Sequence, residues 1–169
     1  MSATNMTELA DRRCVALRRA SAEDAAAVES LLAEQALPRA GVADWLEHFW
    51  VAEGDGAVVG VAGVELYGTS ALLRSVAVAP AWRGTGLGGV LTERALEEAK
   101  AAGARDVYLL TTTADRYFPR HGFACISREA VPETVTASVE FRGACPASAV
   151  VMHRALANTR GSAHGEGVR

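Results

Sequence analysis

The stretch from Val76 to Gly89 carries the residue types best suited to hold an anionic ligand. An apolar run ends at Pro80, Arg83 follows, and four glycines then fall within six residues, before helical periodicity begins. Glycine has no Cβ, so the backbone N–H groups of such a loop can approach a ligand closely. A helix that begins in the loop adds unpaired N–H donors and the positive end of its dipole. The sequence therefore predicts an anion site, for which pyrophosphate is the usual ligand.

Several patterns compete for this loop. Gly84, Gly86 and Gly89 have the GxGxxG spacing of a dinucleotide-binding fingerprint, which also requires an acidic residue about 20 positions further on. The next predicted strand ends in Leu109-Leu110-Thr111-Thr112-Thr113, without a carboxylate, which disfavours a nicotinamide cofactor. A P-loop would need Gly-Lys-Ser/Thr, which is absent from the stretch. A glycine-rich connection that binds no ligand is the remaining alternative.

The full pattern Val-x-Val-x-Pro-x-x-Arg-Gly-x-Gly-x-Gly resembles the acetyl-CoA signature of the GNAT N-acetyltransferase superfamily. In that family the strand before the loop splays from its neighbour, and its backbone pairs with the pantetheine arm of the cofactor. The resemblance therefore implies acetyl-CoA as co-substrate, bound by a strand segment and a pyrophosphate loop. The implied contacts are the backbone of Val76, Ala77 and Val78, and the loop residues Arg83, Gly84, Thr85, Gly86, Leu87, Gly88 and Gly89.

The sequence around this loop predicts one α/β domain over residues 13–156, whose strands and helices would position the loop. It predicts flexible tails at 1–12 and 157–169. Apolar patterns predict strands at 15–20, 50–53, 57–66, 71–79, 106–111 and 148–156, and helices after Ser21, over 86–102 and over 114–120. The resemblance implies their arrangement: a mixed, mostly antiparallel central sheet, flanked by helices and splayed at the acetyl-CoA site.

Glu65 and Arg74 are charged residues that the predicted sheet would bring together. If Leu66 pairs with Ala71 across the turn, Glu65 lies diagonal to Arg74 on one face, within reach of long side chains. An arginine in an apolar central strand needs a partner, because an unpaired buried charge is costly. The pair is either a structural ion pair or a site where the planar guanidinium binds a substrate carboxylate. Glu65 is also the candidate general base, and Ser75 a candidate substrate ligand.

The segment after strand 106–111 departs from the family pattern. Many members carry a tyrosine four residues before the Gly-Phe of the next strand, and this tyrosine protonates the departing CoA thiolate. Phe118 stands at that position here and has no proton to give, whereas Tyr117 precedes it. The acid is therefore Tyr117 or water. The family's common asparagine position is Thr111, so the resemblance places Thr111 and Phe118 at the cofactor.

Two short segments resemble particular branches of the superfamily. Residues 110–113, Phe118 and His121-Gly122-Phe123 are similar to the acetyltransferase domain of N-acetylglutamate synthases. The motif Glu140-Phe141-x-x-x-Cys145-Pro146-Ala147-Ser148-Ala149 strengthens a likeness to the ArsN-type arsenic-resistance N-acetyltransferases. Both relatives acetylate the α-amine of amino-acid-like acceptors, so an arsenic- or phosphorus-containing amino acid is among the implied substrates. The residues implied in acceptor binding are Arg74, Ser75 and Ser148.

Length and composition bound the remaining possibilities. The 169 residues, half of them hydrophobic and 22% charged, fit one globular domain. A net charge of −3 gives no general attraction to nucleic acid or to an anionic membrane, so neither is expected as a partner. The three cysteines lack C-x-x-C spacing, which argues against disulfides and a metal site. The sequence shows no apolar leader and no long apolar stretch, so we expect a cytoplasmic protein. We expect it to be a monomer or a homodimer.

The sequence thus predicts an N-acetyltransferase that acts on a small-molecule amine. Only a neutral amine can attack the thioester carbonyl, so the site must accept a proton and stabilise the developing oxyanion. A backbone N–H within Val76–Val78 is the candidate oxyanion donor. The alternatives are an enzyme similar to N-acetylglutamate synthase and a non-catalytic CoA-binding module, which the missing tyrosine favours weakly.

Overall fold

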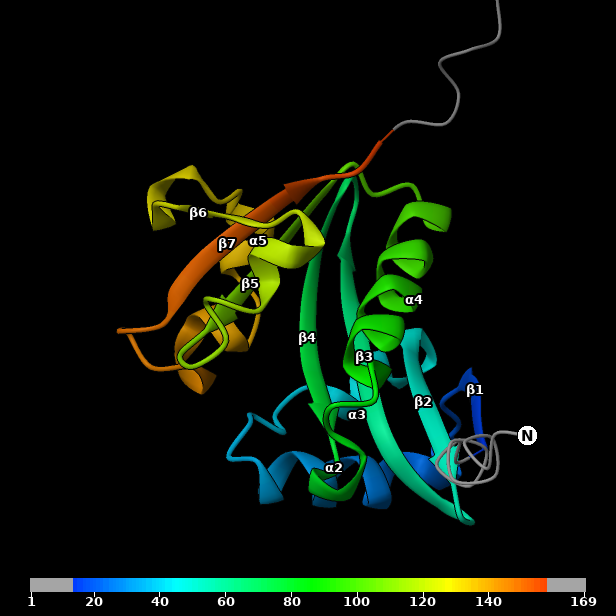
Figure 1. The fold of residues 1–169 in the computed structure, drawn as a ribbon. Helices are drawn as coiled ribbons and strands as arrows, with labels where there is room; N and C mark the ends of the chain where they lie inside the picture. The colour runs from blue at the N-terminus through cyan, green and yellow to red at the C-terminus, as the bar shows by residue number, and fades with distance from the viewer. Residues whose placement is uncertain (1–13, 158–169) are drawn as a thin grey trace, which may run out of the picture. The chain divides into compact units, whose positions relative to one another are not determined.

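The computed structural model describes residues 14–157. The strands in this range form one seven-stranded sheet. The strand order is β1-β2-β3-β4-β5-β7-β6 (Figure 1). The pairs β1–β2, β2–β3, β5–β7 and β6–β7 are antiparallel, whereas β4–β5 is parallel. Helices flank the sheet. The predicted mixed, mostly antiparallel α/β architecture is therefore confirmed.

The strands and helices follow one another much as the apolar patterns predict. The strands are β1 (Val15–Arg19), β2 (Phe49–Gly54), β3 (Ala57–Tyr67), β4 (Ser70–Val78), β5 (Asp106–Thr111), β6 (Ala124–Ile126) and β7 (Val150–Ala155). The α-helices are α2 (Ala25–Glu34), α3 (Val42–Trp45), α4 (Leu87–Ala101) and α5 (Glu133–Thr136). The predicted tails at 1–12 and 157–169 lie outside the described residues, apart from Ala157.

The predicted helix over 114–120 is wrong in extent. The structure has only a one-turn 3-10 helix there, Phe118–His121, with Pro119 in its first turn. Proline has no backbone N–H, so Pro119 could not donate the hydrogen bond to Asp115 that an α-helix over 114–120 requires. The Thr111 hydroxyl accepts a hydrogen bond from the Ala114 N–H, 2.9 Å away, as an N-cap side chain does, and the Tyr117 N–H then donates to the Ala114 carbonyl at 3.0 Å in a single turn.

The chain divides into two compact units, and each unit is built from two separate stretches. Among the described residues, unit 1 contains 14–63 together with Ser75–Ala95, and unit 2 contains Val64–Arg74 together with 96–157. The glycine-rich loop therefore belongs to unit 1, whereas Glu65 and Arg74 belong to unit 2. The assignment of residues 13–156 to a single domain remains a prediction.

The core of unit 1 forms where α2 and α3 pack on β2 and β3. The helical spacing of Val28, Leu31 and Leu32 places all three on one buried face of α2. Phe49 pairs with Gly63 on the neighbouring strand, and a Cβ on Gly63 would lie 2.2 Å from the Phe49 ring. The ring thus fills the space that the glycine leaves. The full cluster is Val28, Leu31, Leu32, Val42, Leu46, Phe49, Val51, Val61 and Ala77.

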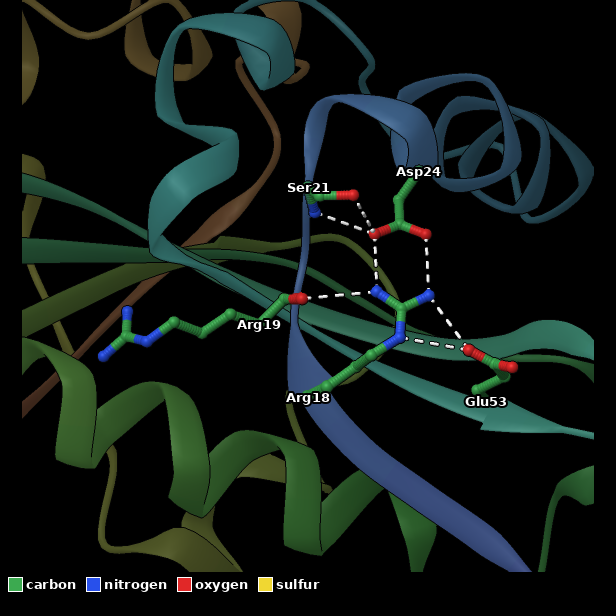
Figure 2. Close-up of polar contacts among 5 residues, drawn as sticks. All are labelled: Arg18, Arg19, Ser21, Asp24 and Glu53. Carbon is green, nitrogen blue, oxygen red and sulfur yellow. Dashed lines mark hydrogen bonds and ion pairs between the residues drawn. The ribbon is translucent and has the colours of Figure 1, made fainter.

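An arginine joins the start of α2 to two strands of unit 1. Figure 2 shows the Arg18 guanidinium of β1 between the carboxylates of Asp24 and Glu53, at 2.7–3.0 Å. The Ser21 backbone N–H donates to Asp24 at 2.7 Å, and the two residues form a capping box at the start of the helical segment. The Arg18 hydrogen bonds, opposed by burial and helped by Ser21, lower the pKa of Asp24 to about 2.

Asp24→Asn should lower the free energy of unfolding at pH 7 by about 1–2 kcal/mol, a modest value because Arg18 is partly solvated. A lowered carboxyl pKa stabilises the fold above the unfolded-state value of about 4, and this stability is lost as the pH falls toward about 2. Denaturant unfolding of both proteins between pH 7 and pH 2 measures the difference, which should shrink across that range. Exposed Glu23→Gln is the matched control; an equal loss in both variants would contradict the ion-pair account.

Unit 2 is built on β5, β6 and β7, with the first part of β4 alongside β5. The parallel register runs from Ser70–Asp106 to Leu72–Tyr108 and thus ends two residues before Arg74. The long segment between β6 and β7 carries α5 and packs onto these strands through Val131 and Val135. The core of this unit contains Leu72, Tyr108, Val131, Val135 and Val151.

Candidate active site

The glycine-rich loop of unit 1 has the backbone shape of an anion site. Gly84 and Gly86 have φ of 78° and 84°, values that favour glycine. A Cβ on either residue would meet no atom within 4 Å, so the loop is open on the side where a ligand would lie. Helix α4 begins at Leu87, and its first backbone hydrogen bond runs from Val90 N–H to the Gly86 carbonyl. The amides of residues 87–89 therefore have no partner within the helix.

Short hydrogen bonds hold the two ends of the loop. The Thr85 hydroxyl donates to the Trp82 carbonyl at 2.6 Å, and the Thr92 hydroxyl donates to the Gly88 carbonyl at 2.8 Å. Arg83 is exposed, and its Nε donates to the Val78 carbonyl at 3.3 Å. The loop therefore combines a fixed backbone with a cationic side chain at the surface. These residues fit a bound pyrophosphate of CoA.

The strand that leads into the loop is irregular at Ser75. This residue is buried and has φ of 60°, a left-handed conformation that is uncommon outside glycine. Such conformations cost about 1–3 kcal/mol and persist where the surroundings fix them. Beyond Ser75, Val76 and Val78 are partly exposed while Ala77 is buried. Gln35 of unit 1 donates to the Val78 carbonyl at 2.6 Å and so anchors the end of the strand.

Four polar residues of unit 2, Glu65, Tyr67, Arg74 and Glu140, form what we call the acid–arginine cluster. Arg74 Nη1 donates to Glu65 Oε2 at 2.7 Å, and Arg74 Nε lies 3.6 Å from Glu140 Oε1. The Tyr67 hydroxyl donates to Glu65 Oε1. The side chains of Arg74, Glu65 and Glu140 are 0%, 2% and 5% exposed, respectively. The predicted Glu65–Arg74 pair is thus present, and both oxygens of Glu65 are engaged.

Burial shifts the pKa of two members of the cluster. It raises the pKa of Glu140 to about 7, with Arg74 opposing the rise and Glu65 adding to it. Burial, followed by the hydrogen bond to Glu65, raises the pKa of Tyr67 well above its ordinary range. Glu140 opens the motif Glu140–Ala149, but the sequence assigns it no role in the site. Its contact with Arg74 joins positions 66 residues apart in the chain, which no local pattern indicates.

The residues expected near the departing thiolate lie together in unit 2. Phe118 is buried, and its ring meets those of Tyr117 and Phe123 edge-on, with centroids 5.1 and 5.8 Å away. The Tyr117 hydroxyl is buried and has no hydrogen-bond partner among residues 14–157. Buried hydroxyls are normally paired, so this oxygen is available to a ligand. Thr111 is buried, and its hydroxyl binds the Ala114 N–H.

Ser148, the remaining predicted substrate ligand, is exposed on the approach to β7. Arg128 holds the same stretch, donating to the carbonyls of Pro146, Ala147 and Ala149 at 3.3–3.4 Å. The structure thus brings together Glu65 and Arg74, whereas Ser75, the Val76–Val78 segment and the glycine-rich loop belong to the other unit. Within residues 14–157 no group of three His, Cys, Asp or Glu residues could hold a metal ion. No helix in that range could span a membrane.

Known proteins match this chain in sequence and in fold. The family model of the acetyltransferase (GNAT) domain matches residues 45–125. An uncharacterised N-acetyltransferase of Chlorobaculum tepidum is 30% identical over 127 residues, which cover 70% of this chain and 81% of that protein. An amino-acid acetyltransferase of Mycobacterium tuberculosis is 37% identical over 93 residues, covering 53% of this chain and about half of the relative, 52%.

Solved structures of other proteins have a fold similar to that of this chain. Rv2747 of M. tuberculosis, in complex with CoA, superposes with a TM-score of 0.72 at 27% identity, over 84% of this chain and 99% of that one. N-acetylglutamate synthase of Neisseria gonorrhoeae, complexed with CoA and N-acetyl-glutamate, has a TM-score of 0.74 at 22% identity and therefore shows the fold alone. The match covers 88% of this chain and 36% of the synthase chain.

These likenesses fit the geometry of the site. The open glycine-rich loop and the start of α4 offer backbone amides where an acetyl-CoA pyrophosphate would bind, and the related structures contain CoA. The chain belongs to the GNAT acetyltransferase family and is an acetyl-CoA-dependent N-acetyltransferase.

Proposed function

We propose that the enzyme acetylates the amine of a small amino-acid-like acceptor with an acidic end, an arsenic- or phosphorus-containing amino acid foremost. The observation that carries this proposal is Arg74, a fully buried guanidinium on the strand that leads into the acetyl-CoA loop. A planar guanidinium suits the paired oxygens of a carboxylate, phosphinate or arsonate group. Ser75 and Ser148 are the further acceptor contacts that we propose.

Glutamate is the second candidate acceptor. A specific observation favours it: the M. tuberculosis relative is an amino-acid acetyltransferase, and the gonococcal structure is that of an N-acetylglutamate synthase. Both acceptor classes present an α-amine and an acidic side chain. We assign the activity to residues 13–156 of a cytoplasmic protein, either monomeric or homodimeric.

The chemistry requires a neutral amine at the thioester carbonyl. Bound acetyl-CoA supplies the activated acetyl group, and the chain supplies positioning, which can lower a barrier by about 7–11 kcal/mol. We propose that backbone N–H groups of Val76–Val78 stabilise the oxyanion, and that Thr111 and Phe118 line the cofactor. Glu65 already accepts hydrogen bonds from Arg74 and Tyr67, which favours a structural role over that of the general base.

Tyr117 is the proposed source of the proton for the departing thiolate. Its buried hydroxyl has no partner within residues 14–157, so its proton is not committed to another described side chain. Phe118, next to it, keeps the tyrosine ring in place through an edge-on contact. Water is the alternative acid.

Thiol release from acetyl-CoA tests the proposal against a panel of amines. Glutamate, phosphinothricin and arsinothricin carry the acidic end, and glutamine is the matched acceptor without it. We expect selective turnover of the phosphorus or arsenic compounds, with glutamine much the poorest. Turnover of glutamate alone would replace the first acceptor class by the second. Binding of acetyl-CoA without turnover of any amine would favour a non-catalytic CoA-binding module.

A further inference from the structure

Glu140 is a buried carboxyl that the proposed chemistry does not use. It begins the π-helical turn Glu140–Ala144, in the long segment between β6 and β7. That segment is fixed by the buried Val135, by Cys145 N–H donating to the Glu140 carbonyl at 3.1 Å, and by Arg128 over the Phe141 ring. The position of Glu140 beside Arg74 is therefore built into the fold of unit 2.

The acid–arginine cluster has one more acid than it has cations. Glu65 is the stronger partner of Arg74, since it is 2.7 Å from Nη1 and also accepts the Tyr67 hydroxyl. Glu140 is the weaker partner, because it lies 3.6 Å from Arg74 Nε. With both acids ionised, the three side chains carry a net charge of −1 in a site that excludes water, which is costly. A proton on Glu140 removes that charge and leaves the Glu65–Arg74 pair intact.

The groups that face Glu140 keep its protonated and ionised forms similar in free energy at neutral pH. Glu65 and Tyr67 on β3, Arg74 on β4 and Cys145 at the end of its own turn all interact with it. Arg74 favours the ionised form, whereas burial and Glu65 favour the neutral form, and the pKa is raised to about 7. The half-buried Cys145 thiol, with a pKa raised to about 12, remains neutral throughout this range.

We propose that Glu140 competes with the acidic end of the acceptor for Arg74, and that the acceptor binds as Glu140 takes up a proton. This inference rests on the proposed function, which places the acceptor's acid at Arg74. A third anion beside a single guanidinium would be strongly repelled, so protonation of Glu140 lowers the electrostatic cost of bringing the acceptor's acid to Arg74. Glu140 is in this sense a positioning residue that selects acidic acceptors at neutral pH and rejects them in alkaline solution.

Binding of an acetylated acceptor tests this proposal without interference from a titrating amine. The probe is N-acetyl-L-glutamate, titrated by calorimetry into the CoA-bound enzyme in two buffers that differ in ionisation enthalpy. For a group with a pKa of about 7, linkage predicts binding about tenfold weaker at pH 8 than at pH 6. It also predicts uptake of nearly one proton per probe at pH 8 and of almost none at pH 6.

Three variants separate the proposal from a structural effect. Glu140→Gln should bind the probe equally at both pH values, without proton uptake, whereas Glu140→Asp retains a titratable carboxyl and should retain the uptake. Exposed Glu133→Gln, in the same segment, should behave as the wild type. Proton uptake that persists in Glu140→Gln, or proton release on binding, would overturn the role of Glu140 while leaving acceptor binding at Arg74. Failure of the wild type to bind the probe at any pH, with another amine turned over, would overturn both proposals.

Discussion

Arg74→Ala should lower the free energy of unfolding by about 3–5 kcal/mol, the cost of leaving a buried charge without its partner. The guanidinium is fully buried between Glu65 and Glu140, so its removal leaves two carboxyls in a site without a cation. Denaturant unfolding at pH 7 measures this loss. The double variant Arg74→Met with Glu65→Gln removes both charges of the closer pair and should recover much of the stability. An unchanged unfolding midpoint in Arg74→Ala would contradict the burial of this pair.

The same residue separates the structural from the substrate-binding interpretation. Arg74→Lys keeps the positive charge but loses the planar fork, so it suits kinetic comparison better than the alanine variant. We expect KM for an acidic acceptor to rise at least roughly tenfold, with KM for acetyl-CoA nearly unchanged. An equal rise in both constants would remove Arg74 from the acceptor site and leave it as a structural residue.

Gly86→Val should abolish binding of acetyl-CoA, raising its dissociation constant at least roughly 100-fold, or about 2.7 kcal/mol. Gly86 has φ of 84°, a conformation that a β-branched residue adopts only with strain. The variant loop must therefore leave the shape in which its amides face the ligand. The valine side chain would also occupy the open space above the loop. Equilibrium titration with acetyl-CoA measures the effect.

Gly56→Val is the matched control for this prediction. Gly56 lies in the turn between β2 and β3 with φ of 77°, and a Cβ there also meets no atom within 4 Å. Both substitutions thus introduce similar backbone strain, about 1–3 kcal/mol, but only one lies in the glycine-rich loop. The control should lose stability and still bind acetyl-CoA. Tight binding by Gly86→Val would refute the assignment of the loop to the cofactor.

The glycine-rich loop could be predicted because its signal is local. Glycine spacing, a preceding proline and the start of helical periodicity all lie within 14 residues, and each has a direct backbone consequence. The structure accordingly has positive φ at Gly84 and Gly86 and starts α4 at Leu87. The Glu65–Arg74 pair could also be predicted from the sequence, because a short turn connects the two strands that carry these residues.

Other parts of the site could not be predicted, because they depend on distant contacts. Serine has no intrinsic preference for φ of 60°, so nothing in the sequence indicates the irregular backbone at Ser75. The contact of Glu140 with Arg74 depends on how the segment between β6 and β7 folds back, and Tyr67 joins the cluster through its neighbour Glu65. A capping threonine and Gly122 predict a helix over 114–120, but Pro119 limits the helical part to the single turn Phe118–His121.

The division of each unit into two stretches has a consequence for synthesis on the ribosome. Unit 1 cannot close until Ser75–Ala95 has emerged, and unit 2 begins with Val64–Arg74 but needs the C-terminal stretch. At about 5–20 residues per second, the first hairpins wait several seconds for their partners. Neither unit is one continuous stretch of the nascent chain. A ribosome-stalled chain ending at Arg74 lacks the second stretch of both units and should therefore be far more sensitive to protease than the released protein.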